Sequence, residues 1–316
     1  MPPTATFPPP AVGIEPHEVM LADGNKMSLV GLSFHDLKQL QWVQEQKFAR
    51  AMMAYNKGSR ERALVTGQAY DTICTILAAQ QSGNQPLDMG IDPRYASLVL
   101  DLLDQQIRRG LGQPSFFEIG YGSGSLLKEV SDHGYRVSGI EVSQTMQEQA
   151  IGVLGERYSD QLLVGELMKL NRKSLSERPS MIYWNDVFEH ICPDEIEDYL
   201  KKIHSLLVRG GALVTITPNW LLRPSDVTGD FCPPRTEACG LHLKEYRLAE
   251  VTRLLKRAGF RQVATPLVVS RGRIYLLGGG LRLFKQWSEL LLDRLPVKYS
   301  DLLCRGLGMS ITIATK

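Results

Sequence analysis

An apolar segment that leads into a glycine-rich turn constrains the fold more than any other feature of the sequence. Ser115–Ile119 is expected to form a buried strand, and the next five residues contain Gly120, Gly122 and Gly124. Glycine lets the backbone turn tightly and lets a ligand approach main-chain N–H groups without a Cβ atom in the way. In an open α/β sheet such a turn lies at the carboxyl ends of the strands, where ligands bind. The segment therefore predicts a ligand-binding strand–turn–helix unit.

From this point onward, short apolar segments alternate with helical segments. Strands are expected at residues 115–119, 136–140, 161–164, 181–184, 212–217, 260–269 and 310–315. Helices are expected between them at 126–133, 144–156, 194–208 and 248–258. Strand–helix alternation of this kind predicts an α/β, doubly wound fold, with a mostly parallel sheet and helices on both of its faces.

The first third of the chain has a different pattern. Ser33 can cap a first helix, and further helices are expected at 63–81 and 93–109. The preceding residues are rich in proline, which resists regular structure. The expected organisation is a proline-rich tail and lead-in at 1–32, a helical N-terminal extension at 33–110, and a main domain at 111–316 with an insertion at 271–307.

Composition excludes several classes of function. The formal net charge is only +2, so no basic field indicates a nucleic-acid partner. The five cysteines form no CxxC pair and are odd in number, which argues against a disulfide framework or a zinc site. The N-terminus lacks the cationic start and apolar run of a secretory signal. No stretch reaches the roughly 18 apolar residues that a membrane span requires. We expect a cytoplasmic protein.

Two carboxylates follow the next two strands of the predicted sheet. Glu141 comes after the strand at 136–140, where a carboxylate can accept hydrogen bonds from ribose hydroxyls. Glu166 follows the strand at 161–164, where a carboxylate can meet the amino group of adenine. An isolated acid at position 141 is more often a solvated loop residue, and Glu166 alone is equally consistent with a surface acid, so the interpretation depends on the two occurring together with the glycine-rich turn.

Together these segments resemble the class I methyltransferase family, which uses S-adenosylmethionine. Residues 118–124 resemble its first motif, and 184–190 resemble its strand-to-helix motif beside the acceptor pocket. Residues 209–211 and 217–219, on either side of the fifth strand, are also typical of the family. The resemblance covers roughly residues 92–270 and implies a seven-stranded sheet whose last strand runs antiparallel. The residues that it assigns to the cofactor are Glu118, Gly120, Gly122, Gly124, Glu141, Glu166 and Asp186.

The end of the fourth strand carries the residues expected to act on the acceptor. Asp186, Glu189 and His190 lie there, and His242 follows the fifth strand. These residues resemble the Glu-x-x-Glu-His set with a distant histidine that is found in metal-dependent O-methyltransferases. Enzymes of this type modify ubiquinone precursors and the 3′ ends of small RNAs. The resemblance implies a Mg²⁺ site, although Asp186 stands where that set has glutamate.

Three mechanisms are consistent with these residues. In the first, Asp186, Glu189, His190 and His242 bind Mg²⁺, which would lower the pKa of an acceptor hydroxyl. In the second, His190 or His242 is a metal-free general base. In the third, the enzyme acts by positioning alone, and these side chains only cap a helix or pack under a loop. The residues expected to be catalytic are Asp186, His190 and His242.

Parts outside the core sheet are expected to recognise the acceptor. The candidates are Tyr55 in the helical extension, Trp220 and Arg223 in the loop 220–239, and the insertion 271–307. The insertion carries an apolar stripe at helical spacing, which is typical of core or of a dimer contact. It is also consistent with an apolar acceptor or a membrane surface. We expect O-methylation of a small-molecule, lipid-like or peptide acceptor, and a homodimer.

Two other functions compete with this one. A nicotinamide-dependent oxidoreductase would share the sheet, but its turn reads G-x-G-x-x-G, and here Gly120, Gly122 and Gly124 are each two residues apart. The other alternative is a methyltransferase-like protein that binds the cofactor without catalysis. Intact glycines and Glu141 argue against it.

Overall fold

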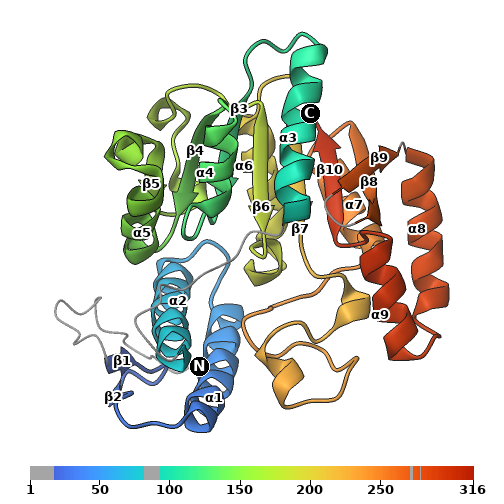
Figure 1. Ribbon diagram of the computed structural model, residues 1–316. Helices are drawn as coiled ribbons and strands as arrows, with labels where there is room; N and C mark the ends of the chain where they lie inside the picture. Colours follow the sequence, from blue (N-terminus) through green and yellow to red (C-terminus); the bar gives the residue numbers. More distant parts are fainter. Residues whose placement is uncertain (1–17, 82–92, 271–272, 278) are drawn as a thin grey trace.

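The computed structural model describes residues 18–81, 93–270, 273–277 and 279–316 (Figure 1). Residues 1–16, the greater part of the predicted proline-rich tail, lie outside the described residues. None of the helices in the described part of the chain is long and apolar enough to cross a membrane.

The core of the molecule is a twisted sheet with strand order β5-β4-β3-β6-β7-β10-β8-β9. Its strands are β3 (Ser115–Ile119), β4 (Arg136–Glu141), β5 (Leu162–Val164), β6 (Met181–Asn185), β7 (Ala212–Ile216), β8 (Gln262–Ser270), β9 (Arg273–Leu277) and β10 (Ile311–Thr315). The five strands from β5 to β7 are parallel, and β10 is antiparallel to both of its neighbours. The predicted seven-stranded sheet with a final antiparallel strand is confirmed. The sequence did not predict β9, an eighth strand that pairs with β8 at the sheet edge.

Helices cover both faces of this sheet. One face is packed by α3 (Pro93–Arg108), α4 (Ser125–Asp132) and α5 (Gln144–Leu154), and the other by α6 (Ile196–Leu206) and α7 (Leu248–Arg257). Their apolar residues recur at helical spacing and enter two separate core clusters, one on each side of the sheet. The predicted extension at 33–110 includes α3, but this helix packs on the sheet and belongs structurally to the main domain.

The N-terminal extension has a small core of its own. It consists of the strands β1 (Glu18–Met20) and β2 (Lys26–Ser28) and the helices α1 (Phe34–Ala54) and α2 (Arg60–Gln80). Ser33 caps α1 as expected: its hydroxyl accepts from the Asp36 N–H, and the Asp36 carboxylate accepts from the Ser33 N–H. The short β1–β2 hairpin lies within the predicted lead-in and was not foreseen.

The extension covers the carboxyl edge of the parallel strands, below the sheet in Figure 1. Arg62 of α2 is buried and its Nη1 lies 2.8 Å from Asp194 Oδ1, in the segment that leads from β6 into α6. Gly58 N–H donates to Glu195 at 2.7 Å. The side chain of Leu241 enters the core of the extension. These contacts place α1 and α2 over the edge where the glycine-rich turn lies.

The predicted insertion folds into β9 and a helical hairpin, α8 (Gly279–Leu292) and α9 (Val297–Gly306). Leu292 and Cys304 of the hairpin pack against Leu221 and Met309. The apolar stripe that the sequence placed in a core or a contact is exposed on this chain: Leu283, Phe284, Trp287, Leu290, Leu291 and Leu295. Two roles were considered typical of this stripe, burial in the chain's own core and a dimer contact. The prediction of burial in the core is therefore wrong.

Gly124 offers a test of how tightly the turn is built. Its φ is +75°, and a Cβ atom there would lie 2.7 Å from Leu154 Cδ1 and 2.9 Å from Ala150 Cβ. Gly124→Ala should therefore lower the free energy of unfolding by about 2–4 kcal/mol, because it combines a left-handed backbone with overpacking. A Cβ atom at Gly152 of α5 would have no other atom within 4 Å, so Gly152→Ala should raise that free energy by about 0.5–1 kcal/mol. Denaturant unfolding followed by circular dichroism measures both. Equal stability of the two variants would contradict the close packing inferred for this turn.

Candidate active site

The glycine-rich turn joins β3 to α4 in a tight backbone path. Gly120, Gly122 and Gly124 all have positive φ, at 70°, 50° and 75°. A Cβ atom at Gly120 would lie only 2.7 Å from Val187 Cγ2, so the turn passes directly against the segment that follows β6. Because glycine has no Cβ atom, a ligand can closely approach the main-chain N–H groups of such a turn.

Glu141 is tied to this turn through its carboxylate. Its Oε2 accepts from Gly122 N–H at 3.0 Å, and its Oε1 accepts from the N–H groups of Val142 and Ser143 at 2.7 and 3.2 Å. A carboxylate has about four lone-pair sites, so acceptor capacity is left on Oε2 for a hydroxyl. Glu141 lies at the end of β4, beside the turn, where the sequence placed a group that binds ribose.

Two further predicted cofactor residues have contrasting environments. Glu118 in β3 is buried, its Oε2 has no hydrogen-bond partner among the described residues, and burial together with the charge of Glu141 holds its pKa well above the usual range. A buried oxygen without a partner fits a site completed by a ligand. Glu166 lies after β5 and pairs with Lys169 Nζ at 2.5 Å on the surface. Its proposed contact with adenine stays a prediction.

Asp186 follows β6 directly and adopts an unusual backbone conformation. Its φ is +51°, a value that asparagine and aspartate adopt more readily than other residues with a Cβ. Its N–H donates to the carbonyl of Ile216 at 3.2 Å, and its Oδ2 accepts from Asn185 Nδ2 at 2.9 Å. Strained residues of this kind cluster at functional sites, and this one lies between the glycine-rich turn and the histidine cluster described next.

Three of the four predicted metal-binding residues converge beyond β6. Glu189, His190 and His242 offer ligand atoms that all lie within 4.8 Å of one another. The rings of the two histidines meet edge to face with centroids 4.8 Å apart. Asp186 is not part of this group, although its charge acts on Glu189. The structure therefore brings together a Glu–His–His set in place of the four-residue set expected from the sequence.

His190 has a defined tautomer. Its Nδ1 lies 2.9 Å from the carbonyl of Leu241, and a carbonyl can only accept, so Nδ1 carries the proton and Nε2 presents a lone pair. Burial, reinforced by the charge of His242, lowers the pKa of His190 to about 3. The ring is therefore neutral at physiological pH.

His242 is held by a carboxylate that the sequence analysis did not single out. Its Nδ1 lies 3.3 Å from both Glu245 Oε1 and Ser225 Oγ. Its Nε2 lies 3.9 Å from Glu189 Oε1. Burial alone would lower the pKa of His242, but hydrogen bonding to Glu245 and the charge of Glu189 outweigh burial and raise it. Glu245 follows His242 by three residues, which is the only sequence signal that links the two.

Glu189 is fully buried, which raises its pKa, as does the nearby charge of Asp186. Its Oε2 accepts from Thr217 Oγ1 at 3.0 Å, whereas its Oε1 has no hydrogen-bond partner among the described residues. Each member of the cluster thus has one polar atom fixed by the protein and a second atom aimed at its neighbours. Hydrogen bonds of this kind, made to the atom that does not bind the metal, orient the side chains that do.

The N-terminal extension, which covers the strand ends, contributes to this site. The ring of Tyr70 in α2 meets His190 with centroids 6.0 Å apart. Burial raises the pKa of Tyr70, and the carboxylates of Glu189 and Glu141 raise it further, so its phenol lies near both parts of the site. Glu45 of α1 accepts from Leu241 N–H at 3.0 Å. Both groups are supplied by helices outside the main domain.

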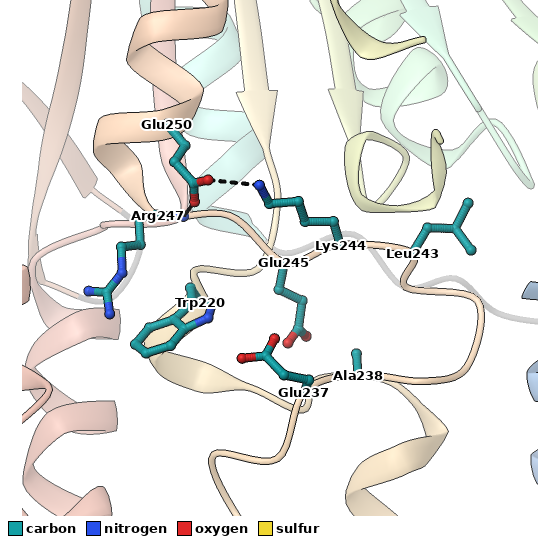
Figure 2. A pocket seen from close by; sticks show the side chains of 8 residues that line it. All are labelled: Trp220, Glu237, Ala238, Leu243, Lys244, Glu245, Arg247 and Glu250. Carbon is teal, nitrogen blue, oxygen red and sulfur yellow. Dashed lines mark hydrogen bonds and ion pairs between the residues drawn. The ribbon is translucent and has the colours of Figure 1, made fainter. Parts of the chain in front are cut away.

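A pocket of about 570 Å³ is lined in part by Glu245, the carboxylate that holds His242 (Figure 2). It is lined by Trp220, Glu237, Ala238, Leu243, Lys244, Glu245, Arg247 and Glu250. The guanidinium carbons of Arg223 and Arg247 lie 3.1 and 3.6 Å from the ring centroid of Trp220. Arg247 Nη1 is buried and has no hydrogen-bond partner among the described residues, although Arg247 Nη2 pairs with Asp293 at 3.2 Å.

The three predicted substrate residues are thus in different places. Trp220 lines the pocket, and the Arg223 guanidinium stacks on the Trp220 ring. Tyr55 ends α1 and packs against the core of the extension, and its carbonyl accepts from Arg62. A role for any of them in binding the acceptor stays a prediction. Lys244 and Arg247, which also line the pocket, were not singled out, because nothing in their sequence context distinguishes them from surface cations.

Comparisons with known proteins agree with this architecture. A family model described as a methyltransferase domain matches residues 89–265. The carboxy-S-adenosyl-L-methionine synthase of Pseudomonas aeruginosa (strain UCBPP-PA14) is 26% identical over 176 residues, which are 55% of this chain and 70% of that protein.

Similar solved structures include two methyltransferases. The CcbJ methyltransferase from Streptomyces caelestis has a TM-score of 0.46 and 16% identity, and the match covers 73% of this chain and 92% of that one. The magnesium protoporphyrin IX methyltransferase from Synechocystis PCC 6803, whose structure contains bound SAH, has a TM-score of 0.41 and 19% identity. That match covers 61% of this chain and 86% of the other.

The family match decides between S-adenosylmethionine and a nicotinamide cofactor, the two that were considered from the sequence. The matched segment contains the glycine-rich turn, Glu141 and the end of β6, and it spans more than half of the chain. The buried free oxygen of Glu118 and the Cβ-free path at Gly120 fit S-adenosylmethionine as the ligand. The chain belongs to the methyltransferase-domain family and is an S-adenosylmethionine-dependent methyltransferase.

Proposed function

We propose that the enzyme methylates an oxygen atom of a small-molecule, lipid-like or peptide acceptor. The observation that supports this best is the cluster of Glu189, His190 and His242. It lies at the end of β6, which pairs with β3, the strand that leads into the glycine-rich turn. An oxygen acceptor requires help with its proton, and these side chains are the groups available there to assist.

The cofactor would be held by the glycine-rich turn, Glu118 and Glu141, with Glu166 on the adenine side. When bound, S-adenosylmethionine supplies an electrophilic methyl carbon and a good leaving group. The work left to the protein is to orient the acceptor, exclude water and manage the acceptor's proton. The position of α2 across the strand ends, with Tyr70 near both Glu141 and Glu189, supports a role in excluding water.

A divalent metal held by Glu189, His190 and His242 explains the state of His190 better than a free base at that residue does, whereas His242, whose pKa is raised, is the histidine that would serve as a metal-free base. A histidine with a strongly lowered pKa is a poor proton acceptor, whereas a neutral imidazole with a free Nε2 is a good ligand. The hydrogen bonds from Nδ1 of His190 to Leu241 and between His242 and Glu245 would fix both rings for ligation. A bound ion would lower the pKa of the acceptor hydroxyl.

The donor set bears on which ion binds. Mg²⁺ prefers oxygen ligands in octahedral geometry, and this cluster offers two imidazole nitrogens and a single carboxylate. Imidazole-rich sets suit borderline transition ions. We therefore propose Mn²⁺ or Zn²⁺ in preference to the Mg²⁺ that the sequence resemblance implied.

The pocket beside Trp220 is the proposed acceptor site. Glu245 both lines this pocket and holds His242, so an acceptor seated there would lie next to the cluster. The pocket combines an indole ring with carboxylate, ammonium and guanidinium groups, which suits a polar acceptor that carries an apolar or aromatic part.

Cofactor binding can be tested at Glu141. Glu141→Ala removes a charged acceptor that also fixes the turn, so it should weaken S-adenosylmethionine binding by about 10–100-fold. Glu148→Ala, which removes an exposed acid from α5, is the matched control and should bind normally. Titration calorimetry with S-adenosylmethionine and with NAD measures both. Tight binding of NAD by the unaltered protein would overturn the cofactor assignment.

Metal dependence can be separated from cofactor binding. A chelator should stop turnover and leave S-adenosylmethionine binding intact, and Mn²⁺ or Zn²⁺ should restore turnover better than Mg²⁺. His242→Ala should lose bound metal, measured by elemental analysis, and Glu245→Gln should weaken metal binding by about 10–100-fold. His133→Ala removes an exposed histidine and serves as the control. Unchanged turnover in chelator would rule out the metal, and a free histidine base would then be tested by its pH profile.

The acceptor atom can be identified from the product. Incubation of metabolite extracts with S-adenosylmethionine carrying a ¹³C-methyl group should give a product whose new methyl resonance has the shift of a methoxy carbon. A resonance typical of an N-methyl group would contradict the proposal. A complete absence of transfer in all extracts, with cofactor binding intact, would instead favour a binding protein without catalysis.

A further inference from the structure

The helical hairpin α8–α9 exposes large apolar side chains on both of its helices. Trp287, Leu290 and Leu302 are 60%, 61% and 69% exposed. The other exposed apolar residues of the hairpin are Leu283, Phe284, Leu291, Leu295, Tyr299 and Leu303. On α8 these positions recur with helical spacing, so they form one stripe along the helix. Exposed apolar patches of this kind mark interaction surfaces.

The opposite face of the hairpin is anchored to the domain. Lys285, Ser288, Glu289 and Leu292 of α8 are buried, at the complementary helical positions. Glu289 Oε1 accepts from Asn219 Nδ2 at 2.6 Å and from Leu248 N–H at 2.8 Å. The hairpin is therefore held in this orientation by buried hydrogen bonds, and its apolar stripe faces outward as a consequence.

The charges of the hairpin are sorted between its two faces. The exposed charged residues between Gly280 and Leu307 are Arg294, Lys298 and Arg305, and all three are basic. The acidic residues are turned toward the protein: Glu289 is buried and Asp293 pairs with Arg247 at 3.2 Å. Asp301 is half-buried. The exposed charged residues of the hairpin are thus positive only, and they accompany exposed leucines and aromatic rings.

This combination of apolar and basic residues distinguishes between two candidate partners of the surface, a second copy of the chain and an anionic lipid membrane. A symmetric contact with a second copy would place the same surface patch on both sides, and with it both sets of three basic residues. Like charges brought together in this way oppose such a contact. An anionic lipid surface instead matches both features, because apolar side chains enter the acyl boundary while basic side chains meet the headgroups.

We propose that the outer face of α8–α9 docks on the surface of a bilayer that contains anionic phospholipids, with Trp287 and Leu290 entering the boundary between headgroups and acyl chains. This role is independent of the acceptor chemistry proposed above. The hairpin also adjoins the pocket, since Asp293 pairs with Arg247 and Leu292 packs in the cluster that includes Trp220. Docking would therefore hold the pocket near the membrane surface.

Vesicle sedimentation of the full chain tests the proposal. The protein should bind vesicles of phosphatidylcholine mixed with phosphatidylglycerol roughly 100-fold more tightly than vesicles of phosphatidylcholine alone, because three basic residues lie at the surface. High salt should abolish this preference. Trp287→Glu/Leu290→Glu should eliminate binding, and Arg294→Glu/Lys298→Glu should eliminate the preference for phosphatidylglycerol.

Leu64→Glu, which places the same charge at an exposed apolar position of α2, is the matched control and should still bind. Unchanged thermal unfolding and unchanged S-adenosylmethionine binding in each variant would show that the fold is intact. Absence of vesicle binding by the unaltered protein would overturn the proposal. If the protein were also a dimer in sedimentation experiments and Trp287→Glu made it a monomer, a second copy would be the occupant instead.

Discussion

The parallel pairing of β3 with β4 and β6 determines where every group of the candidate site can lie. Ile119, the last residue of β3, is paired with Ile140 on one side and with Trp184 on the other. The strands therefore end at nearly the same level. The turn after Ile119, the carboxylate of Glu141 and the segment after Asn185 emerge side by side for this reason. A slip of β4 by one residue would turn its side chains to the opposite face and remove Glu141 from Gly122.

A second constraint is the burial of charge beyond β6. Glu189 is removed from water, and its Oε1 has no hydrogen-bond partner in the described part of the chain, which is costly for a buried carboxylate. His242 offsets part of this cost, because its raised pKa favours the imidazolium form beside Glu189. The candidate ligand atoms of Glu189, His190 and His242 lie within 4.8 Å of one another, so a cation bound among them would supply the missing positive charge. The fold thus holds a buried carboxylate that is costly by itself and is stabilised when a cation lies beside it.

Local patterns in the sequence were sufficient for the parts of the fold that depend on local physics. The cap at Ser33 follows from side-chain chemistry, and the glycine-rich turn follows from the backbone freedom of Gly120 and Gly124. The seven-stranded sheet and its antiparallel last strand came from family resemblance. Periodicity located the apolar stripe of α8 but could not give its partner, because a core and a docking surface have the same spacing.

Other features could not be predicted because they depend on tertiary contacts between separate segments of the chain. Glu245 was part of a segment that the sequence resemblance covered, but its role depends on how the loop folds back onto Ser225 and His242. The strand β9 pairs with the outer edge of β8, and nothing in the local sequence indicates that this edge is available for pairing. Glu45 lies in the middle of a helix, nearly 200 residues before the peptide group that it binds.

That peptide group links the extension to the candidate site. Leu241 donates its N–H to Glu45 of α1 and accepts the Nδ1 proton of His190 with its carbonyl, while its side chain lies in the core of the extension. Glu45 is itself held by Gln41, which accepts from Gln80 of α2. The orientation of His190 therefore depends on both helices of the extension. Because buried hydrogen-bond networks are costly when incomplete, loss of any member would disturb the next. The extension is in this sense a structural part of the site that it covers, since it sets the direction in which the free nitrogen of His190 points.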